Sequence, residues 1–272
     1  MKKIKLFAIA AAMAFVAGCS TEKVDKGICL EHFSTDKYYN VNLADSLRMK
    51  DSEYSLHNIA KIVWPTSIDG EVPTDLQRAI MKIALNDSVS TTLKEAMEKF
   101  EKTGYGLREE ETTNHVATDS THANKAEIMN SVRVEMAQAN DKLYVFSIFN
   151  EGYFAGAAHG MYTQWFVNYD RINKKVVTLE SLFTDKEKLR KLLEAKRKED
   201  LKEQGVDNDH YMLDDSPFPV SESFEIEGSC ITFTYQPYDI ASYAEGMQTV
   251  RLYFYDMNEA GILTPYAKKL LE

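Results

Sequence analysis

Cysteine and long apolar runs are both rare in this sequence. It has three cysteines in 272 residues, and after one apolar run near the N-terminus no stretch is long enough to cross a membrane. It also has no internal repeat. Basic residues are outnumbered, 32 against 42 acidic ones. Because an acidic chain repels the phosphates of nucleic acid, we expect no nucleic-acid partner.

The N-terminus is typical of a bacterial lipoprotein. Three lysines lie within the first five residues, and residues 6–17 form an apolar run that is too short to span a bilayer stably. Small residues then directly precede Cys19. We predict that residues 1–18 are a signal peptide and that Cys19 is lipidated and becomes the mature N-terminus. The other interpretation is an ordinary cleaved signal followed by a chance cysteine.

The residues after the predicted cleavage site indicate where the chain is held. Residues 19–27 form a short polar tether, and fatty acyl chains on Cys19 and its new amino group would anchor it to a membrane. Ser20 stands where an aspartate is associated with inner-membrane retention, which favours the outer membrane, on its periplasmic side or at the cell surface. Without residues 1–18, 29 basic residues face 42 acidic ones and the net charge is near −13.

The spacing of apolar residues predicts an α+β fold with mainly antiparallel sheets and packed helices. A hydrophobic content of 44% is typical of a chain with a packed core. Apolar residues that alternate, or that lie in short runs bounded by turns, predict strands over residues 28–33, 53–64, 132–136, 143–149, 162–169, 176–177, 221–226, 231–235 and 248–255. Helical spacing predicts helices over residues 74–84, 92–104, 179–203 and 264–271.

Local signals add detail to these elements. Thr74 and Gln77 have the spacing of a capping box at the start of a helix. Pro65 should end the strand before it, because proline cannot donate to a β-ladder. Residues 34–52 and 109–125 are polar without periodicity, so we expect both segments to be irregular.

Two cysteines remain once Cys19 is set aside. Cys29 and Cys230 both lie in predicted strands. A disulfide between them would need their Cα atoms within about 7 Å, and a secretory compartment would permit the bond. The alternative, which we favour, is two buried free thiols.

Two stretches of the C-terminal half occur in a recognisable order. Residues 153–160 read YFAGAAHG and lead through an aromatic strand to TLESLF at 178–183. Residues 233–246 read FTYQPYDIASYAEG. With these motifs the chain resembles the extracellular domain of the RsiV-type anti-sigma factors, which also occurs beside peptidoglycan deacetylase domains and alone in lipoproteins. The resemblance extends from about residue 130 to the end and is thinner over residues 28–105.

The resemblance implies two intimately associated subdomains, which we place at residues 28–158 and 159–272. It implies a cell-envelope role without a catalytic mechanism, since the deacetylase-linked relatives carry their chemistry in another domain. In the RsiV-type proteins the domain recognises lysozyme. Ala157 replaces the family's usual second glycine, and Asn173 replaces a turn glycine, so Asn173 should adopt the left-handed conformation.

His159 is the candidate that most suggests chemistry, because a loop histidine close to Gly156 could act as a general base. The motif supplies no serine or cysteine nucleophile and no carboxylate at a fixed offset. We therefore favour a histidine that holds a tight loop through hydrogen bonds to the backbone. Tyr238, Asp239 and Tyr243 could form a binding surface, or the tyrosines could pack against the sheet.

Two other groups of residues have simpler interpretations. His115, Asp119 and His122 lack the spacing of a metal site, so we expect neither a metal nor another cofactor there. Residues 186–198 carry seven basic residues against two acidic ones. They could meet an anionic glycan or an acidic protein, but a solvated helix surface with its leucines turned inward is the favoured interpretation.

These residues together favour binding over catalysis. Our leading hypothesis is a lipid-anchored, monomeric cell-envelope module that recognises a protein or a cell-wall glycan. Lysozyme-like muramidases are the partner class that the resemblance implies, and an acidic chain would attract such basic enzymes. The alternatives are an envelope hydrolase or deacetylase that acts on peptidoglycan through His159, and a structural lipoprotein.

Overall fold

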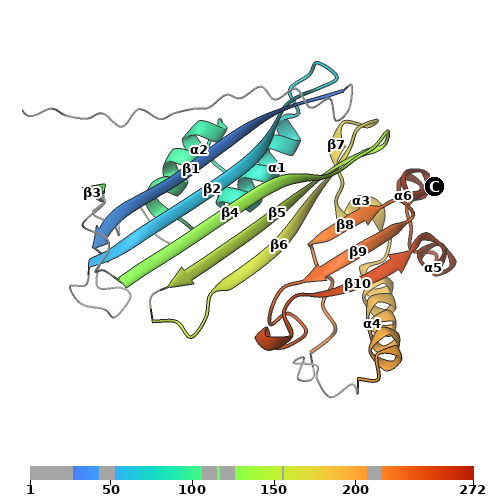
Figure 1. The fold of residues 1–272 in the computed structure, drawn as a ribbon. Coiled ribbons are helices and arrows are strands. Elements are labelled where there is room, and N and C mark those ends of the chain that lie inside the picture. The colour runs from blue at the N-terminus through green and yellow to red at the C-terminus, as the bar shows by residue number, and fades with distance from the viewer. Residues whose placement is uncertain (1–26, 43–52, 106–114, 117–125, 155, 207–215) are drawn as a thin grey trace, which may run out of the picture.

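The computed structural model describes residues 27–42, 53–105, 115–116, 126–154, 156–206 and 216–272. Over these residues the chain has the predicted α+β architecture, with two mainly antiparallel sheets and packed helices (Figure 1). The predicted signal peptide, Cys19 and nearly all of the tether lie outside the described residues, as does nearly all of the segment 109–125. No helix within the described ranges is long and apolar enough to cross a membrane.

The larger sheet has seven strands in the order β3-β1-β2-β4-β5-β6-β7 (Figure 1). Its strands are β1 (Ile28–Asn42), β2 (Glu53–Ile68), β3 (His115–Val116), β4 (Ala126–Ala139), β5 (Leu143–Phe154), β6 (Met161–Asp170) and β7 (Lys175–Val176). Neighbouring strands are antiparallel except β2 and β4, which run parallel. A parallel pair needs a long crossover, and the chain between β2 and β4 provides one that contains two helices.

The first two strands are both longer than predicted. β1 continues to its residue 42, so the expectation of an irregular segment is wrong for residues 34–42. β2 passes Pro65 instead of ending there. The sheet accommodates this proline through a bulge in β2, where Thr66 has no partner between the pairs Cys29–Ser67 and Leu30–Pro65. A residue without an N–H is tolerated at such an irregularity.

Two helices cover one face of the large sheet, α1 (Thr74–Leu85) and α2 (Leu93–Thr103) (Figure 1). They pack on every second residue of the strands, as the pleat requires. The buried strand residues of this core are Ala60, Ile62, Trp64, Ile68, Val132, Val134, Tyr144, Phe146, Ile148, Val167 and Tyr169. The helices therefore leave the other face of the sheet to the remaining half of the chain and to solvent.

The helix caps agree with the prediction only in part. Thr92 caps α2 by accepting a hydrogen bond from the Glu95 N–H. At α1 the predicted capping box is wrong, because the N-cap residue is Pro73 and it provides no side-chain bond. The Gln77 side chain instead donates to the carbonyl oxygen of Pro65 at 2.8 Å, so a contact with the neighbouring strand outcompetes the local cap.

The smaller sheet has three antiparallel strands in the order β10-β9-β8. Its elements are α3 (Leu179–Leu182), α4 (Lys186–Glu203), β8 (Phe224–Glu227), β9 (Cys230–Tyr235), the 3₁₀ turn η4 (Tyr243–Glu245), β10 (Gln248–Tyr253), α5 (Phe254–Glu259) and α6 (Pro265–Leu271). The helix predicted over residues 179–203 is two helices, because Asp185 caps α4 by accepting from the Lys188 N–H. The predicted last strand stops at Tyr253, where α5 follows directly, whereas α6 begins at Pro265 as predicted.

The two sheets meet along β6 and β8. Asn168 is buried in β6, and its amide donates to the Phe224 carbonyl oxygen at 2.7 Å while its side-chain oxygen accepts from the Ile226 N–H at 2.9 Å. Because β5 and β6 pair along their length, the large sheet continues across the boundary expected between residues 158 and 159. The large sheet ends only at β7, so the chain passes from one sheet to the other after Val176.

The turn that follows β6 differs from the prediction by one position. Lys174, and not Asn173, has a positive φ, of 51°. Asn173 instead donates from its side chain to Oδ2 of Asp170 at 2.7 Å and from its backbone to Oδ1 at 2.8 Å. The buried Asp170 carboxylate therefore holds the turn, and the left-handed residue comes after it.

Candidate functional site

Two glycines shape the loop between β5 and β6 that carries His159. Gly156 has a φ of 86°, a conformation that residues with a side chain rarely adopt. Gly160 lies so close to β5 that an added Cβ would be 3.0 Å from the carbonyl oxygen of Gly152. The loop can therefore turn tightly against the end of the sheet, and this fixes the position of His159.

Both ring nitrogens of His159 have hydrogen-bond partners. Nδ1 lies 2.9 Å from the carbonyl oxygen of Gly160, and Nε2 lies 3.0 Å from the Tyr238 hydroxyl oxygen. A carbonyl oxygen only accepts, so Nδ1 donates and, in the neutral ring, Nε2 accepts from the tyrosine. The ring also stacks on Tyr243 with a centroid distance of 3.7 Å and an interplanar angle of 18°. The structure thus brings His159 together with two tyrosines that lie about eighty residues further along the chain.

The segment after β9 presents these tyrosines from a tight turn. Tyr238 has a φ of 74°, which is unusual for a residue with a bulky side chain, and its N–H donates to the Ala241 carbonyl oxygen at 3.1 Å. Asp239 belongs to the same turn, since its Oδ2 accepts from the Gln236 N–H at 2.7 Å. The Asp239 carboxylate is therefore part of the turn, while the side chain of Tyr238 remains 47% exposed.

Further rings extend this cluster across the sheet. Tyr162 of β6 makes an edge contact with Tyr243 at 5.7 Å and stacks with Phe149 of β5 at 6.1 Å. The Arg133 guanidinium of β4 lies 5.7 Å from the centroid of Phe149. We call His159, Tyr238, Tyr243, Tyr162 and Phe149 the aromatic row. Alternation places Tyr162 and Phe149 on strands, but only the pairing of those strands reveals that they join this row.

A cleft of about 570 Å³ adjoins the aromatic row at the end of the sheet where α2 stops. His159 and Tyr162 belong to both. The rest of the lining is mainly aromatic and apolar, with a few polar side chains: Thr103, Tyr105, Ile128, Met129, Asn130, Asn150, Glu151, Gly152, Tyr153, Phe154, Ala157, Met161 and Thr163. Gly152 contributes no side chain, and its place in β5 leaves room that a larger residue would fill.

The buried Asn130, which lines the cleft, belongs to a network of amide hydrogen bonds. The Asn130 amide donates to Oδ1 of Asn58 at 2.8 Å, and the Asn58 amide donates to the carbonyl oxygens of Phe100 and Glu101, each at 3.0 Å. Gly104 lies against this network, since an added Cβ would be 2.2 Å from the Asn130 amide nitrogen. The C-terminal end of α2 is thereby held on the sheet through hydrogen bonds to its carbonyl groups.

Two tyrosines of the site hold their hydroxyl protons more firmly than free tyrosine. Desolvation raises the pKa of Tyr243, and the neighbouring Tyr162 and Tyr238 hydroxyls and the Glu151 carboxylate add to the effect. Burial raises the pKa of Tyr105 far more. Both hydroxyls therefore act as hydrogen-bond donors throughout the physiological pH range.

A second histidine cluster lies on the face of the large sheet away from the helices. His57 Nε2 is 2.8 Å from Oδ1 of Asp36, and Nδ1 is 3.1 Å from Oε1 of Glu127. The ring stacks on Tyr38 with a centroid distance of 3.8 Å. These residues come from β1, β2 and β4, so no local sequence pattern could have indicated them. Within the described residues no group of three or more His, Cys, Asp or Glu side chains is placed to hold a metal ion.

Neither Cys29 nor Cys230 lines the cleft or belongs to the aromatic row. Cys29 and Cys230 are free thiols, and Cys29 is exposed where we expected it to be buried. Burial raises the pKa of the Cys230 thiol. Asp119, His122 and the side chain of His115, at which we expected no metal, lie outside the described residues.

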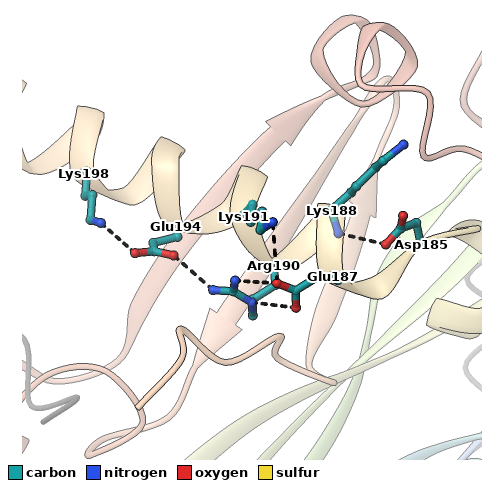
Figure 2. Close-up of polar contacts among 7 residues, drawn as sticks. All are labelled: Asp185, Glu187, Lys188, Arg190, Lys191, Glu194 and Lys198. Carbon is teal, nitrogen blue, oxygen red and sulfur yellow. Dashed lines mark hydrogen bonds and ion pairs between the residues drawn. The ribbon is translucent and has the colours of Figure 1, made fainter. Parts of the chain in front are cut away.

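The basic stretch on α4 has most of its charges paired along the helix (Figure 2). The Arg190 guanidinium lies 2.6 Å from Glu187 and 3.1 Å from Glu194, and the Lys198 ammonium lies 2.6 Å from Glu194. The leucines at 189 and 193 face the core. The stretch is thus a solvated helix surface of alternating charges, and it presents no continuous basic face.

Tyr238 and Tyr243 of the aromatic row lie in the same stretch of sequence as the smaller sheet. Residues 180–255 match the family model described as "Protein of unknown function (DUF3298)". This DUF3298 segment contains α4, the smaller sheet and both tyrosines that contact His159. No curated protein matches the chain.

The fold is similar to crystal structures of two DUF3298 family proteins. The protein from Bacteroides fragilis gives a TM-score of 0.64 at 18% identity, covering 89% of this chain and 96% of its own. The protein from Pseudomonas aeruginosa gives a TM-score of 0.56 at 18% identity, covering 89% of this chain and 97% of its own. At this level of identity the similarity shows the fold alone, and the resemblance to the RsiV-type domain stays a hypothesis.

Proposed function

We propose that this chain is a lipid-anchored binding module of the cell envelope that recognises its ligand at the cleft and the aromatic row, without catalysis. The observation that carries this proposal is the environment of His159, whose two nitrogens are hydrogen-bonded to a backbone carbonyl and to a tyrosine hydroxyl. A general base works beside a nucleophile or an orienting carboxylate. Ring faces around a fully bonded imidazole suit recognition better than proton transfer.

The composition of the cleft supports a cell-wall sugar as the ligand. A volume of about 570 Å³ is within the range of small-molecule sites. Tyr153, which is 37% exposed, and Tyr238 present ring faces that can stack on the C–H groups of a sugar ring. Asn130 and Glu151 can accept hydrogen bonds from sugar hydroxyl and acetamido groups.

Charge supports a protein as the second candidate ligand. The whole sequence has a formal net charge of −10, which would steer basic proteins such as lysozyme-like muramidases towards it. Lipid on Cys19 would hold the module at the membrane, and we place it at the outer membrane because of Ser20. Intact-mass spectrometry of the native protein tests the anchor, since lipidation and loss of residues 1–18 both change the mass.

Calorimetric titration of the full-length protein tests the ligand. One arm uses N-acetylglucosamine oligomers and soluble peptidoglycan fragments, and the other uses lysozyme at low and at moderate salt. Gly152→Leu should fill the cleft and weaken binding at least about tenfold. The fold should tolerate this change, because an added Cβ would lie 3.7 Å from the Met129 carbonyl oxygen and 3.8 Å from Oδ1 of Asn130. Ala137→Leu, at an exposed position of β4 outside the cleft, is the matched control.

Three outcomes would contradict the proposal. The first is that neither ligand class binds at either salt concentration. The second is that Gly152→Leu and Ala137→Leu bind equally well, which would locate recognition elsewhere. The third is turnover of wall fragments that His159→Ala abolishes without lowering the melting temperature, because that result would assign chemistry to His159.

A further inference from the structure

The two long edges of the large sheet differ in how far other elements cover them. On one side, β6 is closed by the smaller sheet: the Gln164 N–H donates to Oε1 of Gln236 at 2.9 Å, and the Gln164 carbonyl oxygen accepts from the Ser223 hydroxyl at 2.7 Å. On the other side, β1 pairs with β2 along its length. Among the described strands only β3 meets the outer edge of β1, and it does so at Tyr39 and Asn40 alone (Figure 1).

The outer edge of β1 therefore offers a template for another strand. Between Glu31 and Lys37 no described strand pairs with it. Alternate N–H and C=O groups of such an edge point outwards, and proteins usually block them with a bulge, a proline or charges. The bulge of the β1–β2 pair lies in β2, opposite Cys29 and Leu30 and beyond this stretch, and the stretch has no proline. What it does have is charge of both signs.

We propose that two copies of this chain pair antiparallel through β1, with the two-fold axis at Ser34. In a symmetric antiparallel pair, each residue faces the residue that is equally far from the axis on the other strand. This register sets Glu31 opposite the partner's Lys37, and His32 opposite the partner's Asp36. Each pair occurs twice in the dimer, so the charges of the strand complement their own copy.

The neighbouring registers lack this complementarity. With the axis at Thr35, Asp36 would face Ser34, and with the axis one residue before Ser34, Glu31 would face Thr35. Opposite charges directly across two antiparallel strands are favourable and like charges are not, so the charges select the Ser34 register. Asp36 can take part although it contacts His57, because its side chain is 68% exposed. We expected a monomer from the sequence. In a monomer no described strand would form hydrogen bonds with the backbone of this edge between Glu31 and Lys37.

Cysteine cross-linking tests the position of the axis. In a full-length Cys29→Ser background, Ser34→Cys would place two thiols opposite each other with Cα atoms about 4.5–5.5 Å apart, within the range of a disulfide. We expect oxidation to convert most of this variant to a covalent dimer, with the linked residue confirmed by peptide mass spectrometry. His32→Cys and Asp36→Cys should not link to themselves, because each would lie about 13 Å from its own copy, but a mixture of the two should link. No cross-link at Ser34→Cys in a folded protein, or equal linking of all three, would overturn the proposal.

Charge exchange tests the register without a covalent bond. Glu31→Lys sets two lysines opposite each other at two places in the dimer, and we expect about tenfold weaker dimerisation by sedimentation equilibrium. The double variant Glu31→Lys/Lys37→Glu exchanges the charges and should dimerise as tightly as the unaltered chain. Lys61→Glu, at an exposed position of β2 away from the edge, is the control and should change nothing. A chain that remains monomeric, or a double variant no better than the single one, would contradict the inference.

Discussion

The two ends of the large sheet are built from the same strands, yet their helix-covered face differs in kind. Near one end, which we call the apolar end, this face buries Trp64, Val134 and Phe146. Near the other, the polar end, β2, β4 and β5 set Asn58, Asn130 and Gly152 side by side in register. The amide network and the cleft both lie at the polar end.

The difference indicates that one end of the sheet mainly stabilises the fold, while the other end mainly forms the binding site. Burial of large apolar side chains stabilises the fold at the apolar end. At the polar end the burial of the amides costs hydration free energy, and only complete hydrogen bonding within the protein offsets that cost. Their net contribution to stability is therefore small. We therefore expect substitutions at the apolar end to change the free energy of unfolding most, and substitutions at the polar end to change binding as well.

Phe146→Ala should give the largest loss of stability. Phe146 is 0% exposed on the helix-covered face of β5, and truncation of such a residue lowers the free energy of unfolding by about 3–5 kcal/mol. Phe149→Ala is the matched control, because Phe149 lies on the same strand but faces the other way and is only half-buried. Urea unfolding measures both. Equal losses would show that the apolar end does not dominate the stability of the sheet.

Asn58→Leu should have an intermediate effect at the polar end. It removes a donor from the carbonyl oxygens of Phe100 and Glu101 and the acceptor of the Asn130 amide, and of these the Phe100 oxygen keeps the Gly104 N–H. We expect a loss of about 1–3 kcal/mol. The double variant Asn58→Leu/Asn130→Leu removes both amides of the pair, so its loss should be smaller than the sum of the two single losses. Strict additivity in this double-mutant cycle would mean that the two amides do not interact.

Local signals in the sequence were sufficient where a few neighbouring residues decide the structure. The cap of α2 at Thr92, the first turn of α6 at Pro265 and the presence of the strands β5 and β6 are of this kind, and they were predicted correctly. Local signals failed where a partner that is distant in the sequence determines the structure. Gln77 bonds to Pro65 instead of capping its own helix, and β1 continues beyond residue 33 because β2 lies beside it.

The candidate site shows the same limit. His159, Tyr238 and Tyr243 are present in the motifs of two separate segments, but their mutual contacts depend on how β6 packs against the smaller sheet. The Asn58–Asn130 pair was not predictable at all, because it depends on the parallel pairing of β2 with β4 across a long crossover. No periodicity within either strand carries that information.

The smallest expected effect concerns Tyr105, which joins the two ends. Its hydroxyl oxygen lies 3.1 Å from the Ala84 carbonyl oxygen of α1 and 3.2 Å from Oδ1 of Asn150 in β5. Tyr105→Phe removes these contacts and should lower the free energy of unfolding by about 1 kcal/mol at neutral pH. Tyr255→Phe, at a side chain that is 71% exposed, is the control and should leave stability unchanged.

The pH dependence of the unfolding free energy of Tyr105→Phe is more informative than the loss at neutral pH. Burial raises the pKa of Tyr105 in the folded chain, whereas in the unfolded chain tyrosine ionises near pH 10, at about its ordinary pKa. The contribution of the buried phenol is therefore complete below about pH 10 and is lost as the pH rises above it, because only the unfolded chain releases the proton readily. Phenylalanine has no such proton, so the unfolding free energy of Tyr105→Phe should fall less steeply between about pH 10 and pH 12. The two curves should therefore converge and then cross, because each pH unit above the unfolded pKa costs the tyrosine form about 1.4 kcal/mol. Parallel curves would mean that water reaches the Tyr105 hydroxyl, and the polar end would then be an open surface instead of a cleft with a sealed wall.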